Sequence, residues 1–313
     1  IELSKNPLVK LLNLFKKYKE IKKIKRTEEF DICISMVESP NVMNILTKTD
    51  EKTYISIHSN KSFELSGIKK RLNQIFLRFF YNKADKIIVV SQGIKEDLVD
   101  NFGVKEFKVE VILNSIDVSK IEKLKKEEID SKELDLFNRG ATIISVGRLS
   151  KAKGHWHLIR AFSHISMIKP DSKLIIVGEG ELRGYLEELI KSLRLESKVH
   201  LLGNKENPYK YMAKADVFGF SSIWEGFGIA LLEALACSLP VVSTNCKSGP
   251  SELLGGQEKS SVIQYCDYGL IVPVCDGVFH MENEVLTAEE YMLAEALLNL
   301  LNEEYLRKKY KEN

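Results

Sequence analysis

The stretch SSIWEGFGIALLEALACSLPVVST, residues 221–244, combines features that could bind an anion. Gly226 and Gly228 would interrupt a helix, so we expect a loop there and a helix that begins near Ile229. The start of a helix beside bare glycine backbone favours negative charge, because its N–H groups point outward and the helix dipole is positive at that end. After Gly226, the only charged side chain in this stretch is Glu233.

Glu233 needs a polar partner. Its helix, IALLEALAC, is apolar at almost every other position, so we expect it to be buried on all sides. A buried carboxylate without a partner costs several kcal/mol. The partner is either a group of the protein, namely a cation or an N–H group, or it is a ligand. The nearby sequence offers no cation before Lys247. A ribose diol would bond both carboxylate oxygens.

A second candidate site lies in VGRLSKAKGHWHLIRAF, residues 146–162. We expect Gly147 to end a strand, and Arg148 and Lys153 to lie on the loop that follows. In a parallel sheet, loops at the carboxyl ends of the strands form the ligand crevice. Two cations there would face a phosphate, unless they are simply solvated.

Two other patterns in the sequence have simpler explanations than a cofactor site or a catalytic group. VGEGELRG, residues 177–184, resembles a dinucleotide fingerprint, but its glycine spacing differs, and Glu179 and Glu181 would repel a pyrophosphate. We expect a tight strand-to-helix turn there and no nicotinamide cofactor. His58 closes a strand in SIHSN, where it is either a polar loop residue or a catalytic group. No D-x-D pair and no histidine spacing typical of a metal site occurs, so no metal is expected.

Short β-branched runs alternate with helical stretches, which predicts parallel sheets covered on both faces, a doubly wound α/β architecture. In the first half, the predicted strands are 30–35, 53–58, 86–91 and 108–113. In the second half, they are 141–147, 173–178, 198–203, 216–221, 240–244 and 269–274.

Two Rossmann-like domains are expected. Residues 1–118 would form the first, 119–140 a charged linker with a surface helix, and 141–313 the second. The second domain would end in one helix behind a capping box at Thr287 and Glu290.

Composition excludes several classes of protein. The chain has 313 residues, of which 44% are hydrophobic, and a net charge of +2, so no nucleic-acid partner is expected. Its five cysteines form no C-x-x-C pair, and Cys33, Cys237 and Cys246 lie in apolar surroundings, which suits a reducing, cytoplasmic compartment. No run of about 18 uncharged apolar residues occurs, so a membrane span is not expected.

The first 26 residues contain nine basic and two acidic side chains. They also carry an apolar helical stripe, formed by Leu8, Leu11, Leu12, Phe15, Ile21 and Ile24. One interpretation is a domain helix whose apolar face covers the sheet and whose lysines are solvated. The other is a basic amphipathic helix on an anionic membrane surface. Both can hold together.

Taken together, these motifs resemble the retaining glycosyltransferases of family 4, which have the GT-B architecture of two facing Rossmann-like domains. The resemblance rests on a Glu-x7-Glu signature at Glu225 and Glu233. It also rests on the order of VGRLSKAKG, LIIVGEGEL, VHLLG, YMAKADVFGFSS and GLIVPV. It covers residues 141–275 well and the first domain more loosely, through FDICIS, ADKIIVVS and VILNSID.

The resemblance implies roles at the donor's phosphates and sugars. Arg148 and Lys153 would bind the diphosphate, with Gly147 also at the donor, and Glu233 would hold the ribose hydroxyls. Glu225 would touch the donor sugar and β-phosphate. Four neighbours would do so through their backbone: Gly226, Phe227, Gly228 and Ile229.

The resemblance also implies residues around the base and the reacting sugar. The base would be bordered by Val177, Gly178, Gly203, Asn204 and Lys205. His58 aligns with a position that in many family members lies beside the reacting sugar.

The implied function is transfer of a sugar from a nucleotide diphosphate sugar to a saccharide or lipid-linked acceptor, with retention at the anomeric carbon. It belongs to the synthesis of surface polysaccharide or glycolipid in the cytoplasm, on the inner face of the membrane. No metal and no cofactor besides the donor substrate are implied. The alternative is a nucleotide-sugar-binding subunit or pseudoenzyme without transfer activity.

The start of the chain departs from the family pattern. Family members begin with a strand and a glycine-rich turn, and nothing like them precedes the helix at residue 7. We therefore expect the first domain to lack its N-terminal part.

Overall fold

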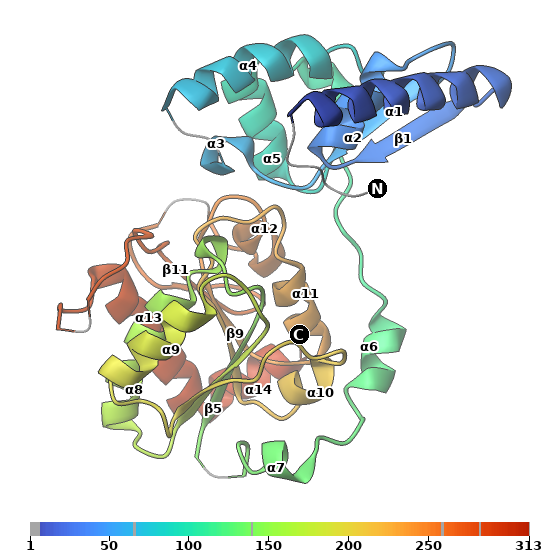
Figure 1. The fold of residues 1–313 in the computed structure, drawn as a ribbon. Coiled ribbons are helices and arrows are strands. Elements are labelled where there is room, and N and C mark those ends of the chain that lie inside the picture. The colour runs from blue at the N-terminus through green and yellow to red at the C-terminus, as the bar shows by residue number, and fades with distance from the viewer. Residues whose placement is uncertain (1–6, 65–66, 139, 258–259, 282, 313) are drawn as a thin grey trace. The chain divides into compact units, whose positions relative to one another are not determined.

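The computed structural model describes residues 7–64, 67–138, 140–257, 260–281 and 283–312 (Figure 1). The chain divides into two compact units, Ile1–Leu113 and Asn114–Asn313. This division differs from the expected boundary at 118/119 and from a separate linker over 119–140. Each unit is built on its own sheet.

The first unit has a four-stranded parallel sheet in the order β1-β2-β3-β4. Its strands are β1 (Ile32–Met36), β2 (Lys52–Ile57), β3 (Lys86–Val89) and β4 (Val109–Val111). Its α-helices are α1 (Pro7–Thr27), α2 (Glu38–Leu46), α3 (Lys61–Glu64), α4 (Gly67–Tyr81) and α5 (Gln92–Glu96). All four strands overlap those predicted from the β-branched runs.

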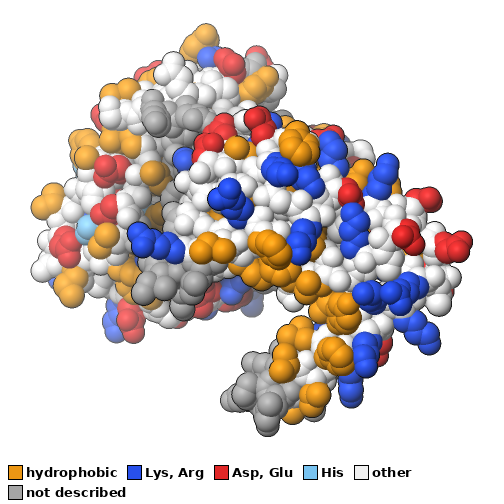
Figure 2. All heavy atoms as spheres, turned by 90° about the horizontal axis from the view of Figure 1, so that it is seen from above, with side chains coloured by type: hydrophobic (Ala, Val, Ile, Leu, Met, Phe, Trp, Pro, Cys, Tyr) orange, Lys and Arg blue, Asp and Glu red, His pale blue; other side chains and the backbone are white. Residues whose placement is uncertain are grey.

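α1 leaves much of its apolar stripe uncovered within this unit. Leu11, Leu12, Phe15 and Ile24 are exposed, and Figure 2 shows apolar side chains in orange beside lysines and arginines in blue on the protein surface. The expectation that the apolar face covers the sheet is therefore wrong for these four residues.

Lys25 departs from the expected solvated lysines of α1. It is buried, and its Nζ lies 2.6 Å from Glu51 Oε1 and donates to Asn44. Burial opposes ionisation of Glu51, but hydrogen bonds from Lys25 and Thr49 bring its pKa down to about 2. This pair ties the C-terminal end of α1 to the start of β2.

The second unit has a seven-stranded sheet in the order β10-β11-β9-β8-β5-β6-β7. The strands are β5 (Thr142–Val146), β6 (Lys173–Val177), β7 (Val199–Leu201), β8 (Val217–Phe220), β9 (Val241–Thr244), β10 (Gln264–Tyr265) and β11 (Leu270–Val272). Six of them were predicted, and they are parallel. β10, a two-residue strand antiparallel to β11, was not predicted.

Helices cover both faces of this sheet, as the unbroken apolar strands predict. They are α6 (Val118–Leu124), α7 (Ser131–Leu134), α8 (His155–Ile168), α9 (Arg183–Ser192), α10 (Tyr209–Met212), α11 (Ile229–Ala236), α12 (Pro250–Leu254), α13 (Ala288–Asn302) and α14 (Glu304–Glu312). Successive strand residues point to opposite faces. Val217 accordingly packs with Trp156 and Leu297, whereas Phe218 packs with Met212 and Leu231.

The segment expected to serve as a linker is part of this second unit. Ile121 and Ile129 are buried in the core that contains Phe218 and Leu231. Asp117 caps α6, because its side chain accepts a hydrogen bond from the Lys120 N–H. The many charged residues of this segment predicted a solvent-exposed linker, although Ile121 and Ile129 are buried.

The C-terminal region forms two helices where one was expected. The capping box at Thr287 and Glu290 is present at the start of α13. The backbone of Glu303 is extended, with φ −93° and ψ 93°, and this ends α13 before α14 begins at Glu304.

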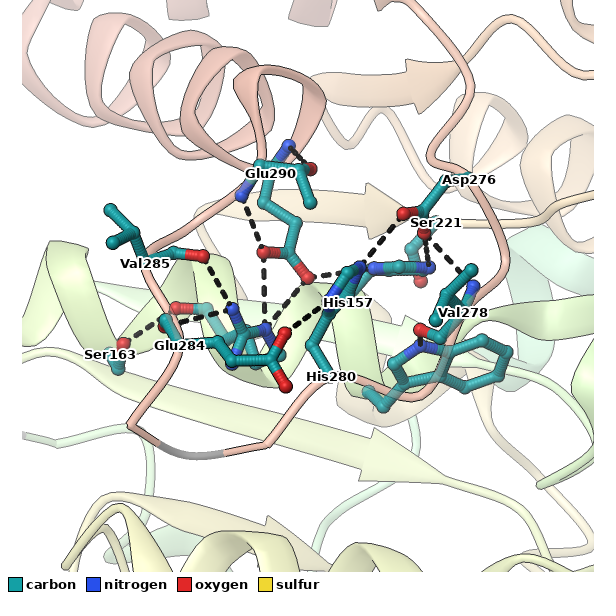
Figure 3. A network of polar contacts seen from close by, with 12 residues as sticks. His157, Ser163, Ser221, Asp276, Val278, His280, Glu284, Val285 and Glu290 are labelled. Atoms are coloured by element: carbon teal, nitrogen blue, oxygen red, sulfur yellow. Dashed lines mark hydrogen bonds and ion pairs between the residues drawn. The ribbon is translucent and has the colours of Figure 1, made fainter.

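A buried polar network joins α8 to the start of α13 (Figure 3). Glu290 is fully buried and accepts hydrogen bonds from Arg160 Nε at 2.9 and 3.1 Å. His157 Nδ1 lies 2.7 Å from the same carboxylate. The terminal nitrogens of Arg160 donate to the carbonyls of Met281, Glu284 and Val285. The loop before α13 is therefore fixed to α8.

His280, in that loop, lies between two carboxylates. Its Nδ1 is 2.8 Å from Glu284 Oε2, and its Nε2 is 2.8 Å from Asp276 Oδ2. The hydrogen bond to Glu284 raises the pKa of His280 most, burial opposes this, and Asp276 raises it further.

This arrangement predicts a pH-dependent stability. Because the folded pKa of His280 is above its unfolded value of about 6.5, its stabilising contribution is fully present below about pH 6.5 and is lost as the pH rises through the folded value. We expect His280→Gln to remove this part of the decline in the free energy of unfolding between about pH 6 and pH 9. His164→Gln, outside the network, should keep it. Urea unfolding at several pH values measures both, and identical slopes for wild type and His280→Gln would contradict the prediction.

Candidate active site

The candidate site of the second unit begins with an ion pair at the carboxyl ends of β5 and β8. Lys153, in a 3-10 turn after β5, places its Nζ 2.5 Å from Oε1 of Glu225, in the loop after β8. Ser222 Oγ donates to the same oxygen at 2.6 Å. The two charged side chains are 22% and 10% exposed, so they are partly shielded from water. Two residues that are 72 positions apart are thus brought together.

Close backbone packing shapes the loop around Lys153. Gly154 has a φ of +59°, and a Cβ there would lie 2.3 Å from the carbonyl oxygen of Ser221. Only glycine fits, because a larger residue would push the β5 and β8 loops apart. Trp156, two residues later, donates from its ring N–H to the carbonyl of Val278. Lys153 is therefore held on a tightly packed turn.

Three candidate glycines meet at the ends of β5, β6 and β7. A Cβ on Gly178 would lie 2.0 Å from the carbonyl oxygen of Gly147. The Gly178 N–H donates to the carbonyl of Gly203 at 2.9 Å. Val177 ends β6, and Asn204 follows Gly203. Gly178 and Gly180 of VGEGELRG therefore serve a tight turn, as expected, whereas Gly184 lies within α9 (Arg183–Ser192).

Arg148 lies in the same loop as Lys153 but is more open to solvent. Its side chain is 72% exposed and forms a 3.1 Å surface ion pair with Glu181. An exposed pair of this kind contributes little to folding stability. Arg148 is therefore free to reorient toward an anion.

α11 begins at Ile229, as predicted, after Gly228 with a φ of +93°. The N–H groups of Leu231 and Leu232 donate to the Gly228 carbonyl, and those of Ile229 and Ala230 precede this first helical hydrogen bond, which favours an anion at this end. Phe227 is buried, and its carbonyl lies so close to Gly249 that a Cβ there would be 1.8 Å away. Gly226 completes the loop and is partly exposed.

Glu233 differs from expectation in two respects. α11 is not buried on all sides, because Ile229 is 46% exposed and Glu233 itself is half-buried. Its partner is a protein hydroxyl, since Tyr209 Oη donates to Oε1 at 2.7 Å. The nearly continuous apolar sequence of this helix overestimated its burial, because one side of α11 remains open in this unit. Among the described residues, no lysine or arginine pairs with Glu233.

Lys205 is paired with a residue that the sequence analysis assigned to a linker. Its Nζ lies 2.6 Å from Oε1 of Glu133, in α7. Tyr211 Oη donates to the other oxygen of Glu133 at 2.5 Å. The sequence did not predict four residues that contact the candidate site residues: Glu133, Tyr211, Tyr209 and Ser222. The best signal for the tyrosines was their place after Asn207 and Pro208, which begin a helical turn next to α11.

His58 lies in the first unit, directly after β2, at the carboxyl edge of its sheet as expected. It is exposed, and its Nε2 lies 2.9 Å from Ser56 Oγ. It lines a pocket of about 290 Å³ together with Val37 and the ion pair between Glu38 and Lys61. Val37 has a φ of +71°, which is strained for a β-branched residue.

The described residues show neither a metal cluster nor a membrane span. Within them, no group of three or more His, Cys, Asp or Glu side chains is placed to hold a metal ion. No helix in this part of the chain is long and apolar enough to cross a bilayer.

Comparison with known proteins identifies two family matches. Residues 126–313 match the family described as Glycosyl transferases group 1. Residues 4–120 match the family described as Glycosyltransferase Family 4. The two matches follow one another along the chain and divide it close to the boundary between the units.

Two relatives cover almost the whole chain. One is N-acetylgalactosamine-N,N'-diacetylbacillosaminyl-diphospho-undecaprenol 4-alpha-N-acetylgalactosaminyltransferase of Campylobacter jejuni, which is 38% identical over 98% of this chain and 77% of its own length. The other is an uncharacterized glycosyltransferase of Methanocaldococcus jannaschii, 33% identical over 99% of this chain and 80% of its own.

Solved structures share the fold. A glycosyltransferase of Rickettsia africae has a TM-score of 0.72, with 22% identity over 100% of this chain and 76% of that one. HepE of Anabaena, in complex with UDP and glucose, has a TM-score of 0.74, with 21% identity over 100% of this chain and 78% of that one. The two units therefore have the parallel α/β sheets of the GT-B fold class.

Proposed function

Because this chain is a glycosyltransferase that belongs to group 1, family 4, we propose that it transfers a sugar from a nucleotide diphosphate sugar with retention at the anomeric carbon. The observation that carries the proposal is the cluster of Lys153, Glu225 and Ser222 beside the start of α11. This cluster presents a cation, free helix N–H groups and a fixed carboxylate within one loop region. A diphosphate bound to a sugar needs these three kinds of group.

The charges that develop during the reaction suggest a role for each residue of the site. As the glycosidic bond to the diphosphate breaks, negative charge grows on the leaving oxygens while the sugar becomes positively charged. Lys153, Arg148 and the N-terminal end of α11 would stabilise the leaving group. Glu225 would hold Lys153 before the donor binds and would face the sugar hydroxyls afterwards. No step assigned to these residues needs a metal ion.

The rest of the donor would extend toward β6 and β7. Glu233 would accept hydrogen bonds from the ribose, and the base would lie against the glycine turns at Gly178 and Gly203, near Lys205. HepE of Anabaena binds UDP and UDP-glucose, which supports a uridine nucleotide as the first donor to test. His58 would contact the reacting sugar.

The acceptor proposed here is a lipid-linked saccharide. The Campylobacter jejuni relative is named for an undecaprenol diphosphate acceptor, and so is a galactosyltransferase of Escherichia coli that is 25% identical over 76% of this chain. Such a lipid stays in the bilayer, so the enzyme would work in the cytoplasm at the membrane surface. The exposed apolar residues of α1, next to its lysines, support this peripheral contact.

Nucleotide binding offers the first experiment. We expect UDP at about 100 times its dissociation constant to stabilise the protein by about 2.7 kcal/mol and to raise the apparent melting temperature by about 5 °C or more. A thermal-shift panel of UDP, GDP and ADP and their sugars measures this. Donor hydrolysis and transfer to undecaprenyl diphosphate saccharides follow. If no nucleotide in the panel shifts the transition, the proposed donor site is wrong.

A further inference from the structure

Glu233 has one fixed and one open carboxylate oxygen. Tyr209 Oη donates to Oε1 at 2.7 Å. Among the described residues, no group donates a hydrogen bond to Oε2. The half-buried carboxylate therefore has an acceptor available on one side and a protein contact on the other. Any ligand diol that meets Glu233 meets a carboxylate whose orientation Tyr209 restricts.

Tyr209 is itself anchored to the backbone around it. Its N–H donates to Asn207 Oδ1 at 3.1 Å. The side-chain amide of Asn207 donates to the carbonyl of Leu124, the last residue of α6, at 2.8 Å. It also donates to the carboxylate of Glu127, which follows α6, at 2.9 Å. α6 also packs against α10 and α11. The contacts of α10 with α6 and with α11 therefore fix the position of Tyr209 relative to Glu233.

The hydroxyl keeps the proton that this contact requires. Burial, together with the hydrogen bond to Glu233, raises the pKa of Tyr209 to about 12. At neutral pH the phenol is thus a donor to the carboxylate and never a competing anion.

We propose that Tyr209 is a positioning residue of the donor site, whose hydroxyl fixes the Glu233 carboxylate so that it accepts hydrogen bonds from the ribose hydroxyls of the nucleotide. This inference rests on the proposed function, which places the ribose at Glu233. A half-buried glutamate side chain without such a contact would lose rotamer freedom when the nucleotide binds. The contact with Tyr209 removes much of that freedom beforehand.

The test compares UDP with 2′-deoxy-UDP, which lacks one of the two hydroxyls. We measure both affinities by calorimetry in the full chain and in Tyr209→Phe, which keeps the ring and removes only the hydroxyl. We expect the wild type to prefer UDP by about tenfold, the scale of one hydrogen bond to a charged group. In Tyr209→Phe, the affinity for UDP should fall about five- to tenfold, and that for 2′-deoxy-UDP by less than about twofold.

Tyr211→Phe is the matched control, because Tyr211 lies in the same helical turn and donates to Glu133 instead of Glu233. It should keep the wild-type preference. If Tyr211→Phe loses the preference as well, or if Tyr209→Phe keeps it, Tyr209 has no specific positioning role. Melting temperatures of both variants establish that they are folded.

Glu233→Gln separates this inference from the proposed function. If Glu233→Gln abolishes the preference and Tyr209→Phe does not, the positioning inference is wrong, and the ribose role of Glu233 stands. If the wild type binds UDP and 2′-deoxy-UDP equally and Glu233→Gln changes neither, the ribose does not lie at Glu233. The ribose role of Glu233 and the positioning role of Tyr209 then fail together, whereas the proposed nucleotide site fails only if UDP does not bind at all.

Discussion

Replacement of Lys153 by alanine is expected to lower the turnover of sugar transfer by about 10²- to 10³-fold, the loss typical of a single group that stabilises developing charge. The Nζ of Lys153 is partly shielded and lies 2.5 Å from Glu225 and 5.5 Å from the centre of the Phe220 ring. Low local dielectric strengthens its interaction with a diphosphate. Release of UDP from a UDP-sugar, with and without acceptor, measures the change.

Lys151→Ala is the control for this experiment. Lys151 belongs to the same 3-10 turn, but it is exposed and its Nζ lies 5.7 Å from the centre of the Phe279 ring. We expect Lys151→Ala to retain nearly all activity. If Lys153→Ala is folded and turns over within about threefold of the wild type, the proposed stabilisation of the leaving group is wrong.

The second large effect is on stability, because Arg160→Met breaks the buried network between α8 and α13. Arg160 and Glu290 are 1% and 0% exposed, so the substitution leaves a carboxylate without its main cation. It also removes the donors to three backbone carbonyls of the preceding loop. We expect a loss of about 3–5 kcal/mol in the free energy of unfolding, measured by urea denaturation.

Arg183→Met removes an arginine of comparable connectivity at the surface. Arg183 pairs with Glu179, in the turn before α9, and with Glu187 in α9, and its side chain is 35% exposed. We expect this variant to lose less than about 1 kcal/mol. Equal losses for Arg160→Met and Arg183→Met would contradict the importance of burial in the network.

Periodicity and turn residues predicted most of the fold. The β-branched runs correspond to ten of the eleven strands among the described residues, because a strand buried on both faces must be continuously apolar. Gly228 and Ile229 marked the start of α11, and Thr287 marked that of α13, through local backbone chemistry. β10 escaped prediction because two residues carry no period.

The candidate site was predicted only in part. Lys153 and Glu225 could be expected at one edge, because both follow parallel strands. Their direct ion pair depends on the conformations of the loops after β5 and β8. The contacts of Glu233 with Tyr209 and of Lys205 with Glu133 depend on how α7, α10 and α11 pack on the sheet. Sequence spacing does not encode such packing. The exposed side of α11 could not be predicted for the same reason, because an apolar sequence does not indicate which side of a helix its neighbours cover.

The assignment of residues 114–140 to the second unit bears on how such proteins can exchange parts during evolution. A gene crossover near residue 113 would keep α6 and α7 together with the sheet that they cover. The contacts of Ile121 and Glu133, and the hydrogen bond between Leu124 and Asn207, would then all come from one parent. A crossover near residue 140 would join α6 and α7 of one parent to α10 and α11 of another. Hybrids that join the first unit of one relative to the second unit of another should therefore be assembled at the earlier seam.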